Sequence, residues 1–139
     1  MTKITVHPSG RSLGADIEGV DLSQPIDDAA FQQILDAWAE HLVLRFRGQK
    51  LTDDQLAEFS ARFGALDDAP IRATGTPQHD RRRDIAVISN IVEGDKPVGS
   101  LGNSELVWHQ DMSYKDLPPK ASILYGVETP ATGGNTEFY

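Results

Sequence analysis

Two helices in the first half of the chain, followed only by segments typical of strands, constrain the fold more than any other feature of this sequence. The first helix is predicted to begin at Asp27 or Asp28, where a carboxylate meets free backbone N–H groups and the positive end of the helix dipole. Apolar side chains then recur at the spacing of one helical face. They are Phe31, Ile34, Leu35, Trp38 and Leu42.

The second helix is marked more sharply at its start. Residues 52–55 form a capping box, and Leu51 and Leu56 occupy the two positions of a hydrophobic staple. Gly64 is predicted to end this helix at the C′ position, because glycine readily adopts the left-handed conformation required there. Between residues 67 and 84 the chain is polar and broken by prolines and glycines, which predicts a long loop.

Strands are predicted before and after these helices, wherever short β-rich or alternating segments occur. The expected strands cover residues 3–6, 15–20, 42–46, 85–88, 91–92, 121–128 and 136–139. Helices early and strands late indicate an α+β fold in which helices cover one side of a sheet. A length of 139 residues fits one domain with a real core.

Composition narrows the function classes. A formal net charge of −8 argues against nucleic acid or an anionic membrane as a partner. The chain has no cysteine, which excludes disulfides and thiolate metal sites. No apolar run approaches the roughly 18 residues of a membrane span, and Met1 is not followed by a signal-peptide pattern. We therefore expect a cytoplasmic protein, and a homo-oligomer is compatible with the sequence.

His109 and Asp111 are candidate metal ligands, since side chains two residues apart share one face of an extended segment. Imidazole plus carboxylate suits non-haem Fe(II) and leaves coordination positions open. The competing interpretation is a surface histidine beside an acid, because a chain this rich in aspartate often contains such a pair by chance. The other histidines, His7, His41 and His79, are expected to be structural or solvated.

Three segments carry a resemblance to a known family. They are LGADIEGVDLSQP at Leu13–Pro25, LVLRFRGQKLTDDQLAEFSARFGAL at Leu42–Leu66, and WHQDMSYKDLPPKASILYGVETPATGGNTEFY at Trp108–Tyr139. Together they resemble the TauD/TfdA family of Fe(II)- and 2-oxoglutarate-dependent dioxygenases, named after taurine and chlorophenoxyacetate dioxygenases. The resemblance runs from about Ile4 to Tyr139.

The resemblance implies both a fold and a reaction. The fold is a double-stranded β-helix, or jelly roll, with amino-terminal flanking helices, here incomplete at the carboxyl terminus. His109 and Asp111 match the family's ligands of Fe(II), and Thr136 matches a threonine that hydrogen-bonds the co-substrate 2-oxoglutarate. In the family, O2 and 2-oxoglutarate are consumed to hydroxylate an unactivated C–H bond, and succinate and CO2 are released. Trp108 is expected to pack in the core beside the metal ligands.

Two family elements, a second iron-binding histidine and an arginine for the 2-oxoglutarate carboxylate, match no residue of this sequence. Residues 1–139 are therefore expected to be the amino-terminal portion of a dioxygenase domain. One alternative is a non-catalytic truncated or degenerate member that binds metal weakly or serves as an interaction domain. A third interpretation is a metal-binding jelly roll of the cupin kind, although such sites are usually richer in histidine.

The substrate is constrained less than the reaction. Taurine-specific members carry a histidine and a tyrosine in the segment that matches residues 64–72, and this chain has neither there. A small anionic organic substrate other than taurine is expected. Asn90 and residues 99–106 are candidates to line its pocket, with the alternative that Asn90 caps a strand end. Arg81–Arg83 could attract an anion, although flanking aspartates favour a solvated loop.

Overall fold

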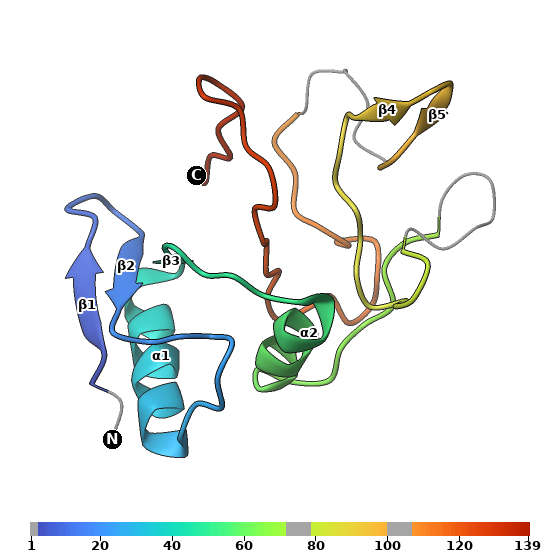
Figure 1. Ribbon diagram of the computed structural model, residues 1–139. Helices are drawn as coiled ribbons and strands as arrows, with labels where there is room; N and C mark the ends of the chain where they lie inside the picture. The colour runs from blue at the N-terminus through green and yellow to red at the C-terminus, as the bar shows by residue number, and fades with distance from the viewer. Residues whose placement is uncertain (1–2, 72–78, 100–106) are drawn as a thin grey trace. The chain divides into compact units, whose positions relative to one another are not determined.

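A computed structural model describes residues 3–71, 79–99 and 107–139 of the chain (Figure 1). The residues form two compact units, Met1–Arg62 and Phe63–Tyr139. Both described helices lie in the first unit, and neither is long and apolar enough to cross a membrane. The α+β class predicted from the sequence is confirmed for the first unit.

The first unit is built on a three-stranded sheet in the order β1-β2-β3. Strands β1 (Thr5–Pro8) and β2 (Ala15–Glu18) pair antiparallel, whereas β2 and β3 (Leu44–Phe46) pair parallel. Parallel strands need a long crossover, and helix α1 (Asp28–His41) supplies it. The strands expected at residues 3–6, 15–20 and 42–46 are thus present with slightly shifted bounds.

Helix α1 begins as predicted and buries its apolar face. The Asp27 carboxylate caps it by accepting a hydrogen bond from the Ala30 N–H at 2.8 Å. Ile34 is fully buried, and Ala15 and Ile17 of β2, the strand that α1 contacts, are buried as well. The remaining buried positions of the helix are Ala30, Phe31 and Ala37.

The carboxyl end of α1 departs from the predicted periodic face. Leu42 was expected there, but it is 63% exposed and follows the helix as its C-cap. Its φ of 64° lies in the left-handed region, and its N–H donates to the Trp38 carbonyl at 2.8 Å. The helix therefore ends at a residue with positive φ, whose side chain is exposed and does not extend the buried face.

Helix α2 (Asp53–Ala61) confirms the capping box in both directions. The Gln55 N–H donates to the Thr52 hydroxyl at 3.2 Å, and the Thr52 N–H donates to the Gln55 amide oxygen at 2.8 Å. The prediction that Gly64 is the C′ residue is wrong by one position, since Arg62 is the C-cap. The Arg62 N–H reaches the Phe59 carbonyl, so the last turn tightens and the helix ends earlier.

Aromatic contacts fix α2 to the rest of the first unit. The Phe59 ring meets the rings of Phe31 and Phe46 edge to face, with centroid separations of 6.5 and 5.7 Å. The Arg62 guanidinium lies 4.2 Å from the Phe31 ring centroid and donates to the Ile26 carbonyl at 2.6 Å. The first unit therefore has a continuous apolar core.

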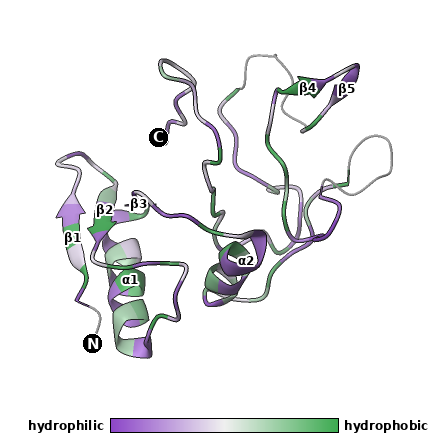
Figure 2. Ribbon diagram, in the orientation of Figure 1, coloured by the Kyte–Doolittle hydropathy of each residue, from purple (hydrophilic) through white to green (hydrophobic). Residues whose placement is uncertain are grey.

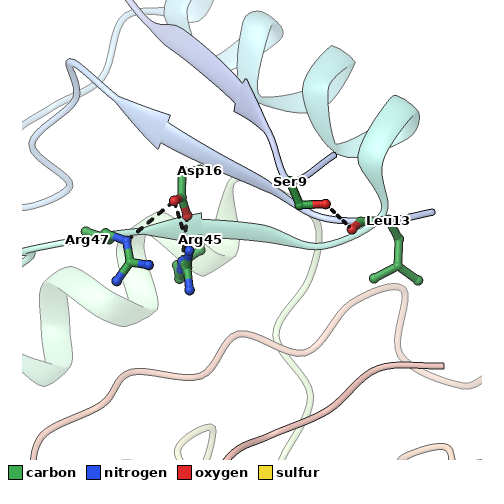
Figure 3. Close-up of polar contacts among 5 residues, drawn as sticks. All are labelled: Ser9, Leu13, Asp16, Arg45 and Arg47. Atoms are coloured by element: carbon green, nitrogen blue, oxygen red, sulfur yellow. Dashed lines mark hydrogen bonds and ion pairs between the residues drawn. The ribbon is translucent and has the colours of Figure 1, made fainter. Parts of the chain in front are cut away.

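The sheet face opposite α1 is polar and centres on Asp16. Its carboxylate accepts two hydrogen bonds from the Arg45 guanidinium, at 2.5 and 2.9 Å, and one from Arg47 at 3.4 Å (Figure 3). Asp16 and Arg45 are direct partners in the β2–β3 register. The hydrogen bonds from Arg45 lower the pKa of Asp16 from its usual 3.8 to about 2.

This lowered pKa predicts a pH dependence of folding. Because the folded state holds Asp16 ionised more strongly than the unfolded state does, its contribution is complete above about pH 4. It is lost as the pH falls from about 4 to about 2. After allowance for solvent screening, we expect a loss of about 1 kcal/mol. Between about pH 4 and about pH 2, the free energy of unfolding measured with urea should fall less in Asp16→Asn than in the unsubstituted protein. Equal decreases in the two proteins would contradict this expectation.

Gly19 allows a close backbone approach. Its φ is +84°, and a Cβ at this position would lie 2.3 Å from the Lys3 carbonyl oxygen. Gly19→Ala is therefore expected to lower the free energy of unfolding by about 2 kcal/mol. Gly10→Ala is the matched control, because Gly10 also has a positive φ but no atom within 4 Å of the added Cβ. If denaturant titrations showed that Gly19→Ala and Gly10→Ala lower the free energy of unfolding equally, the steric explanation would be ruled out.

The second unit contains a short antiparallel hairpin of β4 (Val92–Glu93) and β5 (Lys96–Pro97), with Gly94 in the turn at φ 62°. The Val98 N–H donates to the Ile91 carbonyl at 2.9 Å and extends the pairing. Gly99 is buried against the backbone of Ser89, where a Cβ would come within 2.5 Å of the Ser89 nitrogen.

Several strands predicted in the second unit are not formed. The described residues contain no strand at 85–88, 121–128 or 136–139, and of Ile91–Val92 only Val92 lies in a strand. These predictions are wrong because β-propensity needs a paired neighbour, and pairing is non-local. Hydrophobic residues occur along these irregular segments (Figure 2), and Val107, Leu117 and Val127 are more than three-quarters exposed. The described strands form only the sheet and the hairpin, so the jelly roll stays a prediction.

Candidate metal centre

The His109–Asp111 pair lies on an irregular segment that enters a turn. The extended segment predicted from the sequence does not continue through Asp111, because residues 107–110 are in no strand and residues 111–114 form a turn. The two side chains nevertheless lie together, with 3.1 Å between His109 Nε2 and Asp111 Oδ1. Met112 has a φ of 52°, and the Lys115 N–H donates to the Met112 carbonyl at 3.0 Å. Asp111 is thus the first residue of the turn, and His109 lies two residues before it.

The imidazole of His109 is held at both nitrogens. Its Nδ1 lies 2.8 Å from the Val107 carbonyl oxygen, and its Nε2 lies 3.1 Å from Asp111 Oδ1. A carbonyl only accepts hydrogen bonds, so Nδ1 carries a proton and donates it. Nε2 then faces a carboxylate oxygen, an arrangement that is favourable only with a proton or a cation between the two atoms. The hydrogen bond to the Val107 carbonyl raises the pKa of His109, and the negative charge of Asp111 raises it further.

These two donors fit a divalent metal. With metal–ligand distances of about 2.1 Å, two ligands in adjacent octahedral positions lie about 3 Å apart. The observed Nε2 to Oδ1 separation is 3.1 Å. The hydrogen bond from Nδ1 to a carbonyl is the outer-shell contact that orients metal-binding histidines and leaves Nε2 as the ligand atom. Imidazole and carboxylate together suit Fe(II).

The pair is open to solvent. The side chains of His109 and Asp111 are 57% and 61% exposed. Within residues 3–71, 79–99 and 107–139, no group of three or more histidine, aspartate or glutamate side chains could hold a metal ion. Trp108 is 67% exposed and its ring lies 5.9 Å from that of Tyr139, so the prediction that it packs in the core is wrong.

Two further contacts reach the turn. The Ser122 hydroxyl donates to Asp111 Oδ2 at 3.4 Å, which leaves Oδ1 turned toward His109. The Lys115 ammonium lies 2.5 Å from Asp67 Oδ2 and lowers the pKa of that carboxyl. Neither contact is predicted by the sequence. Their partners are 11 and 48 residues apart, and no local spacing pattern signals such pairs.

The other predicted site residues that the structure describes do not bond to this pair. Asn90 is exposed between Ser89 and Ile91, and Thr136 is exposed two residues after Gly134. Among the described residues, neither makes a hydrogen bond or ion pair with His109 or Asp111. Of the segment 99–106 only Gly99 lies within the described residues.

The triple-arginine segment is partly occupied by internal contacts. The Arg82 guanidinium donates to both carboxylate oxygens of Asp84, at 2.9 and 2.6 Å, and lowers the pKa of that group. Arg81 and Arg83 are exposed. The solvated-loop interpretation therefore fits these two arginines, whereas Arg82 has a structural role.

Comparison with known proteins places the chain in a family. Residues 5–139 match the family model described as taurine catabolism dioxygenase TauD, TfdA family. The chain belongs to the TauD/TfdA family. The matched range includes all three segments that carry the resemblance.

Curated relatives of this TauD/TfdA chain are longer than it is. Pentalenolactone F synthase of Streptomyces avermitilis is 34% identical over 132 residues, which cover 94% of this chain and 42% of the relative. The alpha-ketoglutarate-dependent sulfate ester dioxygenase of Pseudomonas putida is 37% identical over 134 residues, which cover 96% and 40%. The chain thus spans about two-fifths of the length of these relatives. A solved taurine dioxygenase from Burkholderia xenovorans is 38% identical, with a TM-score of 0.46, covering 49% of this chain and 25% of that one.

Proposed function

We propose that residues 1–139 are the amino-terminal portion of an Fe(II)- and 2-oxoglutarate-dependent dioxygenase domain of jelly-roll fold. The reaction couples decarboxylation of 2-oxoglutarate to succinate and CO2 with hydroxylation of an unactivated C–H bond by O2. The observation that carries this proposal is the separation of 3.1 Å between His109 Nε2 and Asp111 Oδ1. Family membership over residues 5–139 supports the same reaction class.

The residues of the chain have distinct roles in this proposal. His109 and Asp111 hold Fe(II), and the Val107 carbonyl fixes the imidazole tautomer that leaves Nε2 as a ligand. Fe(II) bound there supplies the redox chemistry with O2 and 2-oxoglutarate. Thr136 donates a hydrogen bond to 2-oxoglutarate. Because the relatives are more than twice as long as the matched segment, we assign the third iron ligand and the cation for 2-oxoglutarate to the part of the domain that this chain does not cover.

A small anionic organic molecule is the proposed substrate. The similarity to a sulfate ester dioxygenase supports this class, because a sulfate ester carries a negative charge. The lack of a histidine or tyrosine at residues 64–72 argues against taurine. Asn90 is the proposed substrate contact, since it is an exposed amide just before β4 and can donate and accept hydrogen bonds.

A second candidate function is a non-catalytic domain that binds metal weakly or serves as an interaction surface. One observation favours it: the part of the chain that the structure describes holds no group of three potential ligands. Two ligands that are both more than half exposed bind a divalent metal weakly, because water competes for every remaining position.

Anaerobic titration with Fe(II) and 2-oxoglutarate tests the proposed function. A weak visible charge-transfer band is expected when 2-oxoglutarate chelates iron held by His109 and Asp111. The band should be absent in His109→Ala. If the unsubstituted protein is folded, as judged by circular dichroism, and gives no band at millimolar Fe(II), the non-catalytic candidate is favoured instead.

A further inference from the structure

The turn that carries Asp111 is tied to a loop far away in the sequence by one ion pair. The Lys115 ammonium reaches Asp67 Oδ2 at 2.5 Å across 48 residues of chain. The two side chains are 34% and 45% exposed, so the pair is partly shielded from water. Asp67 lies in the loop that follows α2, and both residues belong to the second unit.

The turn needs such an external contact because its backbone is not intrinsically favoured. Met112 has a φ of 52°, in the left-handed region that non-glycine side chains rarely adopt. The hydrogen bond from the Lys115 N–H to the Met112 carbonyl closes the turn at its far end. Lys115 therefore takes part twice, through its backbone in the turn itself and through its side chain in the ion pair.

Movement of the turn would separate the metal ligands. His109 precedes the turn and Asp111 is its first residue, so their separation of 3.1 Å depends on how the turn is placed relative to residue 109. The Ser122 hydroxyl restrains only one carboxylate oxygen of Asp111, at 3.4 Å. By comparison, the Lys115–Asp67 contact is shorter and joins opposite charges, which makes it the stronger restraint.

We propose that Lys115 is a positioning residue, which through its ion pair with Asp67 holds the turn so that Asp111 faces His109. The proposal rests on the proposed function only in taking His109 and Asp111 as metal ligands. The effect of Lys115 on the turn itself does not depend on a metal.

Amide hydrogen exchange of the metal-free protein tests the structural part. In Lys115→Met, the amide of residue 115 is expected to exchange about threefold to fivefold faster, the size of effect of a partly exposed ion pair. Lys115→Arg keeps the charge and should exchange at the original rate. Lys96→Met, in β5, is the matched control for loss of a lysine charge and should leave this amide unchanged.

Mn(II) affinity, measured by electron paramagnetic resonance, tests the positioning part. If Mn(II) binds only when the Lys115–Asp67 ion pair holds the turn, the dissociation constant for Mn(II) should rise about twofold to fivefold in Lys115→Met. It should not rise in Lys115→Arg or Lys96→Met. A general loss of folding would not be rescued selectively by arginine, so the rescue identifies positioning.

The outcomes separate this inference from the proposed function. If the unsubstituted protein binds no Mn(II), the metal-ligand assignment fails and the positioning proposal is overturned with it, whatever the exchange rates are. If Mn(II) binds but Lys115→Met and Lys115→Arg have the same affinity, only the positioning proposal is overturned. Unchanged amide exchange in Lys115→Met would overturn it as well.

Discussion

Replacing His109 by alanine is expected to lower the affinity of the protein for Mn(II) by about 100-fold or more. Loss of an outer-shell contact alone typically lowers metal affinity by about 10- to 100-fold, and loss of one of two protein ligands removes more. The expectation follows from the position of His109 Nε2, which lies 3.1 Å from Asp111 Oδ1 with Nδ1 already bonded to the Val107 carbonyl. Titration with Mn(II), followed by electron paramagnetic resonance, measures the change.

Two further variants make this result specific. His7→Ala removes an exposed histidine that faces Glu18 at 3.3 Å in the first unit, and it should bind Mn(II) like the unsubstituted protein. Asp111→Asn keeps the shape of the side chain but removes its charge, and it should weaken binding comparably to His109→Ala. Equal affinities of the His109 and His7 variants would mean that bound Mn(II) sits elsewhere.

The second large effect is expected on stability. Ile34→Ala should lower the free energy of unfolding by about 3.5 kcal/mol, because it removes buried methyl and methylene groups and leaves a cavity under α1. Among the described residues, Ile34 is the largest fully buried side chain, and its helix α1 contacts β2 and β3. Chemical denaturation followed by far-ultraviolet circular dichroism reports the loss, since both described helices lie in this unit.

Graded controls test the cavity explanation. Ile34→Val removes one methylene group and should cost about 1 kcal/mol. Glu40→Ala changes a residue of the same helix whose side chain is 77% exposed, and it should be nearly neutral. Equal losses of stability in the three variants would contradict the cavity explanation.

The helices could be predicted from sequence because their signals are local. The capping box of Thr52 and Gln55 and the N-cap of Asp27 depend on residues three positions apart, and both are present in the structure. Strands depend on distant partners. Residues 85–88 and 121–128 have the composition of strands, yet among the described residues they are in none, because composition does not specify a pairing.

The same distinction between local signals and distant contacts applies to the candidate site. His109 and Asp111 are two residues apart, so sequence reasoning could pair them, although it expected an extended segment in place of a turn. The contacts that orient them could not be predicted. Ser122 meets Asp111, and Lys115 meets Asp67, only through the fold of the second unit. Met112 has a positive φ although it is neither glycine nor asparagine, so its residue type does not signal the turn.

Pulsed electron paramagnetic resonance of the Mn(II)-loaded protein tests the central claim most directly, because it detects the nitrogen of an imidazole bound to the metal. We predict an imidazole nitrogen coupling in the unsubstituted protein that persists in His7→Ala and disappears in His109→Ala. Bound Mn(II) without nitrogen coupling, or a coupling that survives in His109→Ala, would contradict the assignment of His109 as a metal ligand.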